Sequence, residues 1–133
     1  MPFEIIEHPG DAITEIMSLV EVVYPSHPTP EDVEAYVARA HEVIDAQHGQ
    51  PFCCLADQRA IRVMSPELVV ALGELNRYAY ARGMRRTARL VSSAMGGLQA
   101  HRLAREHQLE LQVFESRDAA LAWLRERQPL HEV

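Results

Sequence analysis

The spacing of apolar residues changes repeatedly along the chain, and the change is clearest in its last third. The stretch Arg89–Leu124 has the pattern of a strand, a glycine-bearing turn, a helix, a strand and a final helix. Strands that alternate with helices in this way are typical of parallel β-sheets whose strands are joined by helical crossovers. We therefore predict an α/β fold built on one mixed, mostly parallel sheet.

Two helix starts upstream share one signature. Thr29 and Ser65 are each followed by proline and an acidic residue, which suits the N-cap, the first helical position and the positive end of the helix dipole. The pattern predicts helices from Pro30 to about Gly49 and from Pro66 to about Arg82. The expected core-facing residues are Val33, Tyr36, Val37, Ala40, Val43 and Ile44 in the first helix and Leu68, Val69, Leu72, Leu75 and Ala79 in the second.

Short apolar runs supply the strands. Four of them are Phe3–Glu7, Pro51–Ala56, Thr87–Val91 and Leu109–Phe114. A helix that runs from Gly97 to about His107, and another that is capped by Ser116 and ends at Pro129, complete the pattern. With a strand in residues 13–24, the order is β-β-α-β-α-β-α-β-α, with about five strands and four helices.

Residues 13–24 fit two structures. Ile13, Ile16 and Met17 have helical spacing, whereas Val20 and its β-branched neighbours favour a strand. The run ends in PSHPTP, which a helix cannot continue. We predict a strand.

Length and composition describe an ordinary globular chain. Its 133 residues fit a single domain, and 47% apolar with 24% charged residues is a common balance. No apolar run approaches 18 residues, and the first residues lack the features of a signal peptide. We expect a cytoplasmic domain without a membrane span.

Charge is distributed unevenly. The chain has no lysine and a net charge of −6, yet residues 59–105 contain nine arginines and two glutamates. The acidic total and the lack of basic runs interleaved with aromatics argue against a nucleic-acid partner. Between the second helix and the fourth strand lie Arg82, Arg85, Arg86 and Arg89. We predict that these four face a protein partner or a sister subunit in a homodimer; the alternative is solvated arginines that pair with local acids.

The element order resembles that of the STAS-like domains, which include bacterial anti-sigma-factor antagonists and the SpoIIAA-like, STAS/Sec14-type small proteins. The matching segments are Leu55–Arg59, Ala88–Ser93 and Val113–Leu124. The resemblance covers most of the chain and implies the fold, but it says nothing about the ligand.

The resemblance also implies where a regulatory switch would lie. In the family, a partner kinase phosphorylates a serine in an Asp-Ser-Ser-Gly element that opens the second helix, after an Asp at the end of the third strand. Asp57 matches that Asp, but the element falls on Ser65-Pro66-Glu67-Leu68, whose two middle residues carry no hydroxyl. The switch is therefore not carried over, and Ser65 is expected to act as a helix cap.

Metal ligation has weak support. His41, Asp45 and His48 have the spacing of one helix face, but they border the apolar stripe and no fourth ligand lies nearby in sequence. The adjacent Cys53 and Cys54 should point to opposite faces of a strand and pack in the interior. We expect no metal and no cofactor.

A ligand site is expected from the fold. Parallel α/β sheets bind ligands beyond the carboxyl ends of their strands, and a helix N-terminus beside glycines suits an anion. The candidate ligand-binding residues at that edge are Asp57, Arg59, Arg62, Ser65, Ser92, Ser93, Gly96 and Gly97. Gly96 and Gly97 have the alternative role of letting their helix approach the sheet closely.

Three functions follow from these patterns. We favour a non-enzymatic STAS-like domain that acts through protein contacts. The alternative is a module that binds a small anionic molecule or a lipid at the strand ends. An enzyme that uses Ser92 or Asp57 is the third hypothesis, for which SSAMGG lacks the G-x-S-x-G pattern of a nucleophile elbow.

Overall fold

A five-stranded mixed sheet forms the centre of the protein. The computed structural model describes residues 2–10, 17–92 and 111–126. The strands are β1 (Glu4–His8), β2 (Ser18–Val23), β3 (Phe52–Asp57), β4 (Met84–Leu90) and β5 (Leu111–Phe114). They lie in the order β1-β2-β3-β4-β5, with β1 antiparallel to β2 and every other pair parallel. The predicted α/β class and the mixed, mostly parallel sheet are confirmed.

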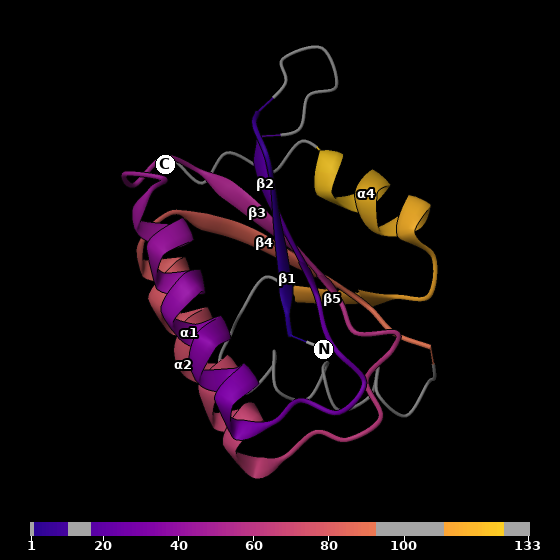
Figure 1. The fold of residues 1–133 in the computed structure, drawn as a ribbon. Coiled ribbons are helices and arrows are strands. Elements are labelled where there is room, and N and C mark those ends of the chain that lie inside the picture. The colour runs from indigo at the N-terminus through magenta and orange to yellow at the C-terminus, as the bar shows by residue number, and fades with distance from the viewer. Residues whose placement is uncertain (1, 11–16, 93–110, 127–133) are drawn as a thin grey trace.

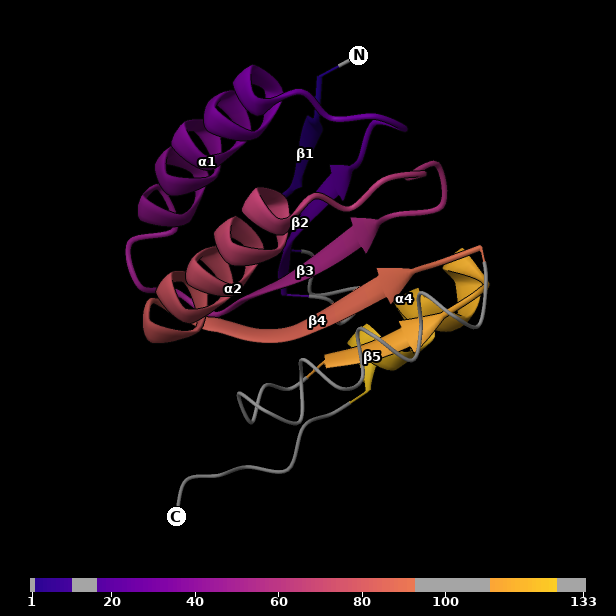
Figure 2. The same cartoon turned by 90° about the horizontal axis from the view of Figure 1, so that it is seen from below.

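Helices cover both faces of this sheet. The described helices are α1 (Pro30–Asp45), α2 (Pro66–Ala81) and α4 (Arg117–Arg125). Helices α1 and α2 lie side by side on one face, and α4 lies on the other (Figures 1 and 2). The helix expected between Gly97 and His107 falls outside the described residues. None of the described helices is long and apolar enough to cross a membrane.

The predicted caps form as local chemistry requires. Thr29 accepts a hydrogen bond from the Asp32 amide, and the Asp32 carboxylate accepts one from the Thr29 amide, both at 3.0 Å. Ser65 and Ser116 cap α2 and α4 in the simpler way, through one bond from an amide three residues on. These local signals fixed all three helix starts in the sequence.

Each face of the sheet has its own core. Phe52 and Ala56 point toward α1 and α2, whereas Cys53 and Leu55 point toward α4. This alternation is the period of a strand that is buried on both faces. Cys53 is fully buried and Cys54 half-buried; burial raises the pKa of Cys53 to about 11 and that of Cys54 to about 12.

The structure corrects two details. Val69 was expected in the core but is 42% exposed, because one helical residue turns it about 100° away from the stripe begun by Leu68. The fourth strand begins at Met84 and not at Thr87, since Met84 pairs with Phe52 and Arg86 with Cys53, with a shift in register at Arg85 between them. In residues 13–24, β2 confirms a strand over the described part.

Gly83 makes the tight connection into β4. Its φ of +117° lies in the region that favours glycine, and a Cβ there would stand 2.7 Å from the Gln50 carbonyl oxygen. The Gly83 carbonyl in turn accepts a hydrogen bond of 3.2 Å from the Phe52 amide. This close approach sets where β4 starts beside β3.

Candidate functional site

The carboxyl ends of β2, β3 and β4 meet at one edge of the sheet (Figure 2). Backbone hydrogen bonds continue the ladder past the strands, from the Tyr24 amide to the Asp57 carbonyl and from the Gln58 amide to the Leu90 carbonyl, both 2.9 Å. The loop after β3 is joined to the loop after β2 by the Arg62 amide, which donates to the Ser26 carbonyl at 2.8 Å. The expected edge therefore exists, and two of its loops are held together.

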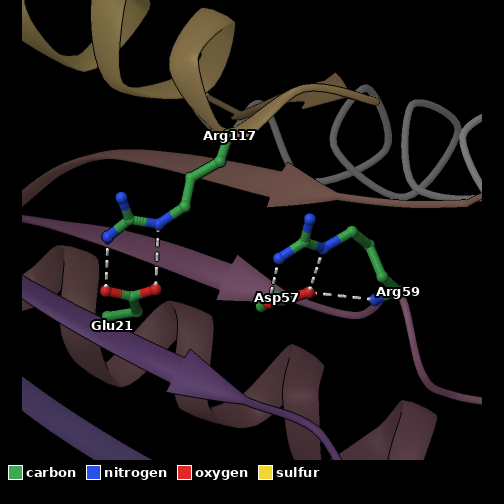
Figure 3. Close-up of polar contacts among 4 residues, drawn as sticks. All are labelled: Glu21, Asp57, Arg59 and Arg117. Carbon is green, nitrogen blue, oxygen red and sulfur yellow. Dashed lines mark hydrogen bonds and ion pairs between the residues drawn. The ribbon is translucent and has the colours of Figure 1, made fainter.

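Asp57 and Arg59 pair with each other at this edge. The Arg59 side chain donates to both carboxylate oxygens of Asp57, at 3.0 and 2.8 Å, and its amide adds a third bond of 3.2 Å (Figure 3). The hydrogen bond from Arg59 outweighs burial and lowers the pKa of Asp57. Asp57 is therefore ionised at neutral pH and already accepts three hydrogen bonds from Arg59, which makes it a poor general base.

Glu21 forms a second charged group beside this pair. Its carboxylate, 8% exposed, accepts hydrogen bonds from Arg117 at 3.0 and 3.4 Å (Figure 3) and lies 3.0 Å from His8 Nε2. Burial raises the pKa of Glu21, but the hydrogen bonds and charges of Arg117 and His8 outweigh it and lower the pKa. The group joins β1, β2 and α4, so it fastens α4 to the sheet.

The structure brings only part of the predicted ligand site together. Asp57 and Arg59 form an ion pair with each other, and Ser65 caps α2. The side chain of Arg62 is exposed, and its backbone amide holds the loop after β3 to the loop after β2. Ser92 is exposed. Ser93, Gly96 and Gly97 lie outside the described residues.

The predicted four-arginine surface does not form. Alternation along β4 sends Arg86 and Arg89 to opposite faces of the sheet, where they are 7% and 4% exposed. Arg86 donates to the Trp123 carbonyl at 2.7 Å, and its guanidinium lies 4.5 Å from the Trp123 ring centre. Arg82 lies 3.5 Å from the ring centre of Tyr78, and Arg85 is exposed.

A polar group that the sequence reasoning missed lies on the α1 and α2 face of the same edge. Arg89 and Gln58 are 4% and 5% exposed, and both adjoin the buried Tyr24. Burial raises the pKa of Tyr24 and that of Tyr36, against the positive charge of Arg89. The sequence contained a signal for this group, because Arg89 is a charged residue within the otherwise apolar run Ala88–Val91.

Two of the three residues that were weighed as metal ligands contact the same tyrosine, Tyr78. His41 stacks on Tyr78 with ring centres 4.1 Å apart, and Asp45 accepts a 2.6 Å hydrogen bond from the Tyr78 hydroxyl. His48 lies beyond the end of α1 with a φ of 53°. In the described part of the chain, no three His, Cys, Asp or Glu residues gather as a metal site.

The described structure is that of a small mixed α/β domain whose strand ends carry paired charges. Residues 19–125 match the family model described as SpoIIAA-like, and the chain belongs to that family. None of the curated proteins matches the sequence significantly.

Two solved structures show the same fold. One is an uncharacterised protein of the DUF3478 family with a SpoIIAA-like fold from Shewanella loihica PV-4, with a TM-score of 0.74 and 15% identity over 92% of this chain and 94% of that one. The other is the protein TM1081, with a TM-score of 0.61 and 8% identity over 82% and 83% of the two chains. At these identities the likeness extends to the fold alone.

Proposed function

We propose that this chain is a cytoplasmic, non-enzymatic interaction module that binds a protein partner through an apolar surface at the start of α2. The surface consists of Val63, Met64, Val69 and Val70, which are 53%, 36%, 42% and 60% exposed. These are the large hydrophobic residues that stand exposed in the described part of the chain, and all four fall within residues 63–70. Such a gathering is the single observation that carries the proposal, because exposed apolar side chains that cluster mark interaction sites.

The place of this apolar surface in the fold supports the proposal. It surrounds Ser65 and Glu67, the positions onto which the family's switch element falls. Ser65 is engaged as the cap of α2, since its hydroxyl accepts the Leu68 amide at 3.2 Å. We therefore propose an interaction that does not depend on a kinase acting at Ser65.

A lipid in the interior has less support. A cavity of about 50 Å³ lies between the sheet and helices α1 and α2, bordered by Tyr36, Cys54 and Asn76 among others. An engineered apolar cavity of about 150 Å³ is needed to hold benzene, so this much smaller space suits a few waters and not an acyl chain. The Asn76 Nδ2, buried without a partner, is a suitable group for such a water.

Val70→Glu is expected to abolish partner binding while leaving the fold intact. The side chain is 60% exposed, so a carboxylate there stays in water in the free protein but is buried without a partner in the complex. The measurement is affinity capture from the native host, followed by titration of the purified partner. We expect at least a tenfold loss of affinity.

Ala38→Glu is the matched control, because Ala38 is an exposed position of α1 away from the apolar surface. It should retain the partner that Val70→Glu loses. If both variants capture the same proteins in the same amounts, the apolar surface is not the interface. Sedimentation of the wild-type and both variants reveals whether the partner is a second copy of the chain.

A further inference from the structure

Arg89 is a buried charge, and no residue that the structure describes supplies a compensating anion. Its side chain points from β4 toward α1 and α2 and is 4% exposed, and its Nε has no hydrogen-bond partner among residues 2–10, 17–92 and 111–126. None of the ion pairs among the described residues involves it. Folded proteins rarely bury a guanidinium in this state, because a charge removed from water needs a partner of opposite sign.

Arg86, on the same strand, is a buried arginine whose guanidinium has partners within the chain. Its guanidinium donates to the Trp123 carbonyl, lies over the Trp123 ring and stands 3.6 Å from the Glu126 carboxylate. Two arginines three residues apart thus meet different surroundings. Arg86 has a counter-charge within the chain, whereas the surroundings of Arg89 supply donors and aromatic rings.

Gln58 adds a second buried donor at the same place. It is 5% exposed, and in the described part of the chain its Nε2 has no partner at hydrogen-bond geometry, although its side chain lies close to Tyr24. Ala56 is the register partner of Arg89, so Gln58, two residues on, is its diagonal neighbour on the same face of the sheet. Diagonal neighbours lie about 7–8 Å apart, within reach of two long side chains.

The rest of the environment also favours an anion. Tyr24 lies near both Arg89 and Gln58, and Tyr36 lies near Arg89, so two buried phenols adjoin the guanidinium. Helices α1 and α2 both start at this edge of the sheet, and their positive ends point toward it. Positive charge and hydrogen-bond donors therefore gather at this edge of the sheet.

We propose that Arg89 and Gln58 form a binding site for an oxyanion, with the Tyr24 and Tyr36 hydroxyls as further donors. The ligand is a phosphate or carboxylate group, free or as part of a larger metabolite, because the planar fork of an arginine binds both in a bidentate manner. The anion supplies the charge that Arg89 lacks and accepts from the Gln58 amide. This anion site shares no residue with the apolar surface at α2, so each proposal can fail without the other.

Thermal unfolding of the full chain tests the anion site. Inorganic phosphate, acetate and chloride are titrated at matched ionic strength, so that the phosphate and carboxylate arms distinguish the two chemistries. We expect phosphate or acetate, but not chloride, to raise the Tm by roughly 3–6 °C at about ten times Kd, and by a further constant step for each tenfold rise in concentration. Arg89→Met removes the charge at similar volume, and we expect it to weaken the apparent affinity at least tenfold.

Arg85→Met is the matched control, since it removes an exposed arginine from the same strand. It should keep the wild-type response. If Arg89→Met does not fold, two other measurements take its place. The first is the Tm response of Gln58→Leu. The second is the Arg89 Nε–H signal of the wild-type protein in ¹⁵N-correlated NMR spectra, which should shift along a saturation curve as the anion is added. Equal Tm responses of the Arg85 and Arg89 variants, or an Arg89 signal that no probe moves, would overturn the proposal.

Discussion

Trp123→Ala should destabilise the protein more than any surface substitution, with a loss of about 3–5 kcal/mol in the free energy of unfolding. The indole is 8% exposed, with its ring centre 5.7 Å from that of Phe114 and 4.5 Å from the Arg86 guanidinium. Truncation to alanine removes packing between α4 and the sheet, and it also exposes the side of the Arg86 guanidinium that the indole ring covers. Small domains have only about 5–15 kcal/mol in total, so the loss is severe.

Urea unfolding followed by far-ultraviolet circular dichroism measures the effect, because Trp123 is the chain's one tryptophan and its removal abolishes that fluorescence. Leu121→Ala is the control on the same helix; Leu121 is only half-buried at the edge of this core, and we expect a loss of about 1–2 kcal/mol. A Trp123→Ala cost no larger than that of Leu121→Ala would contradict the role given to α4. A folded Trp123→Ala should still bind the protein partner, because α4 and the apolar surface lie on opposite faces of the sheet.

The sequence predicted the parts of the fold that local chemistry decides. Thr29, Ser65 and Ser116 are helix caps because the chain around each supplies the cap, the first-turn acid and the apolar stripe within a few residues. The strand signal of β3 is equally local, since a run buried on both faces contains little else than apolar residues. These elements in order were enough to indicate the α/β class.

The charged groups at the strand ends could not be predicted in the same way. Glu21 and Arg117 are 96 residues apart, and only the packing of α4 against the sheet brings them together. Arg89 was grouped with Arg82 and Arg85 because they are neighbours in sequence, whereas strand alternation and the start of β4 at Met84 decide which face each one occupies. The buried polar residues follow from the register of the sheet, which a sequence without the structure does not give.

Glu21→Gln is expected to lower the free energy of unfolding by about 2–3 kcal/mol at neutral pH. Removing one partner of a fully buried ion pair costs about 3–5 kcal/mol. Here the cost is smaller, because the side chains of Arg117 and His8 are each 42% exposed and regain water when the carboxylate is lost. Chemical denaturation of the two proteins measures the difference, and Glu74→Gln, an exposed change on α2, should stay within about 0.5 kcal/mol.

The Glu21 contribution should also depend on pH, with a sign that follows from its lowered pKa. In the unfolded chain the carboxyl titrates near its ordinary value of 4.5, whereas Arg117 and His8 hold the pKa lower in the folded protein against the effect of burial. The folded state therefore gains stability above pH 4.5 and loses it as the pH falls through the folded pKa. The difference between wild-type and Glu21→Gln should shrink as the pH falls below 4.5. If the difference stays unchanged down to pH 3, the Glu21→Gln variant is destabilised by altered packing and not by loss of the carboxylate charge. Arg117 would then not hold α4 to the sheet through its ion pair.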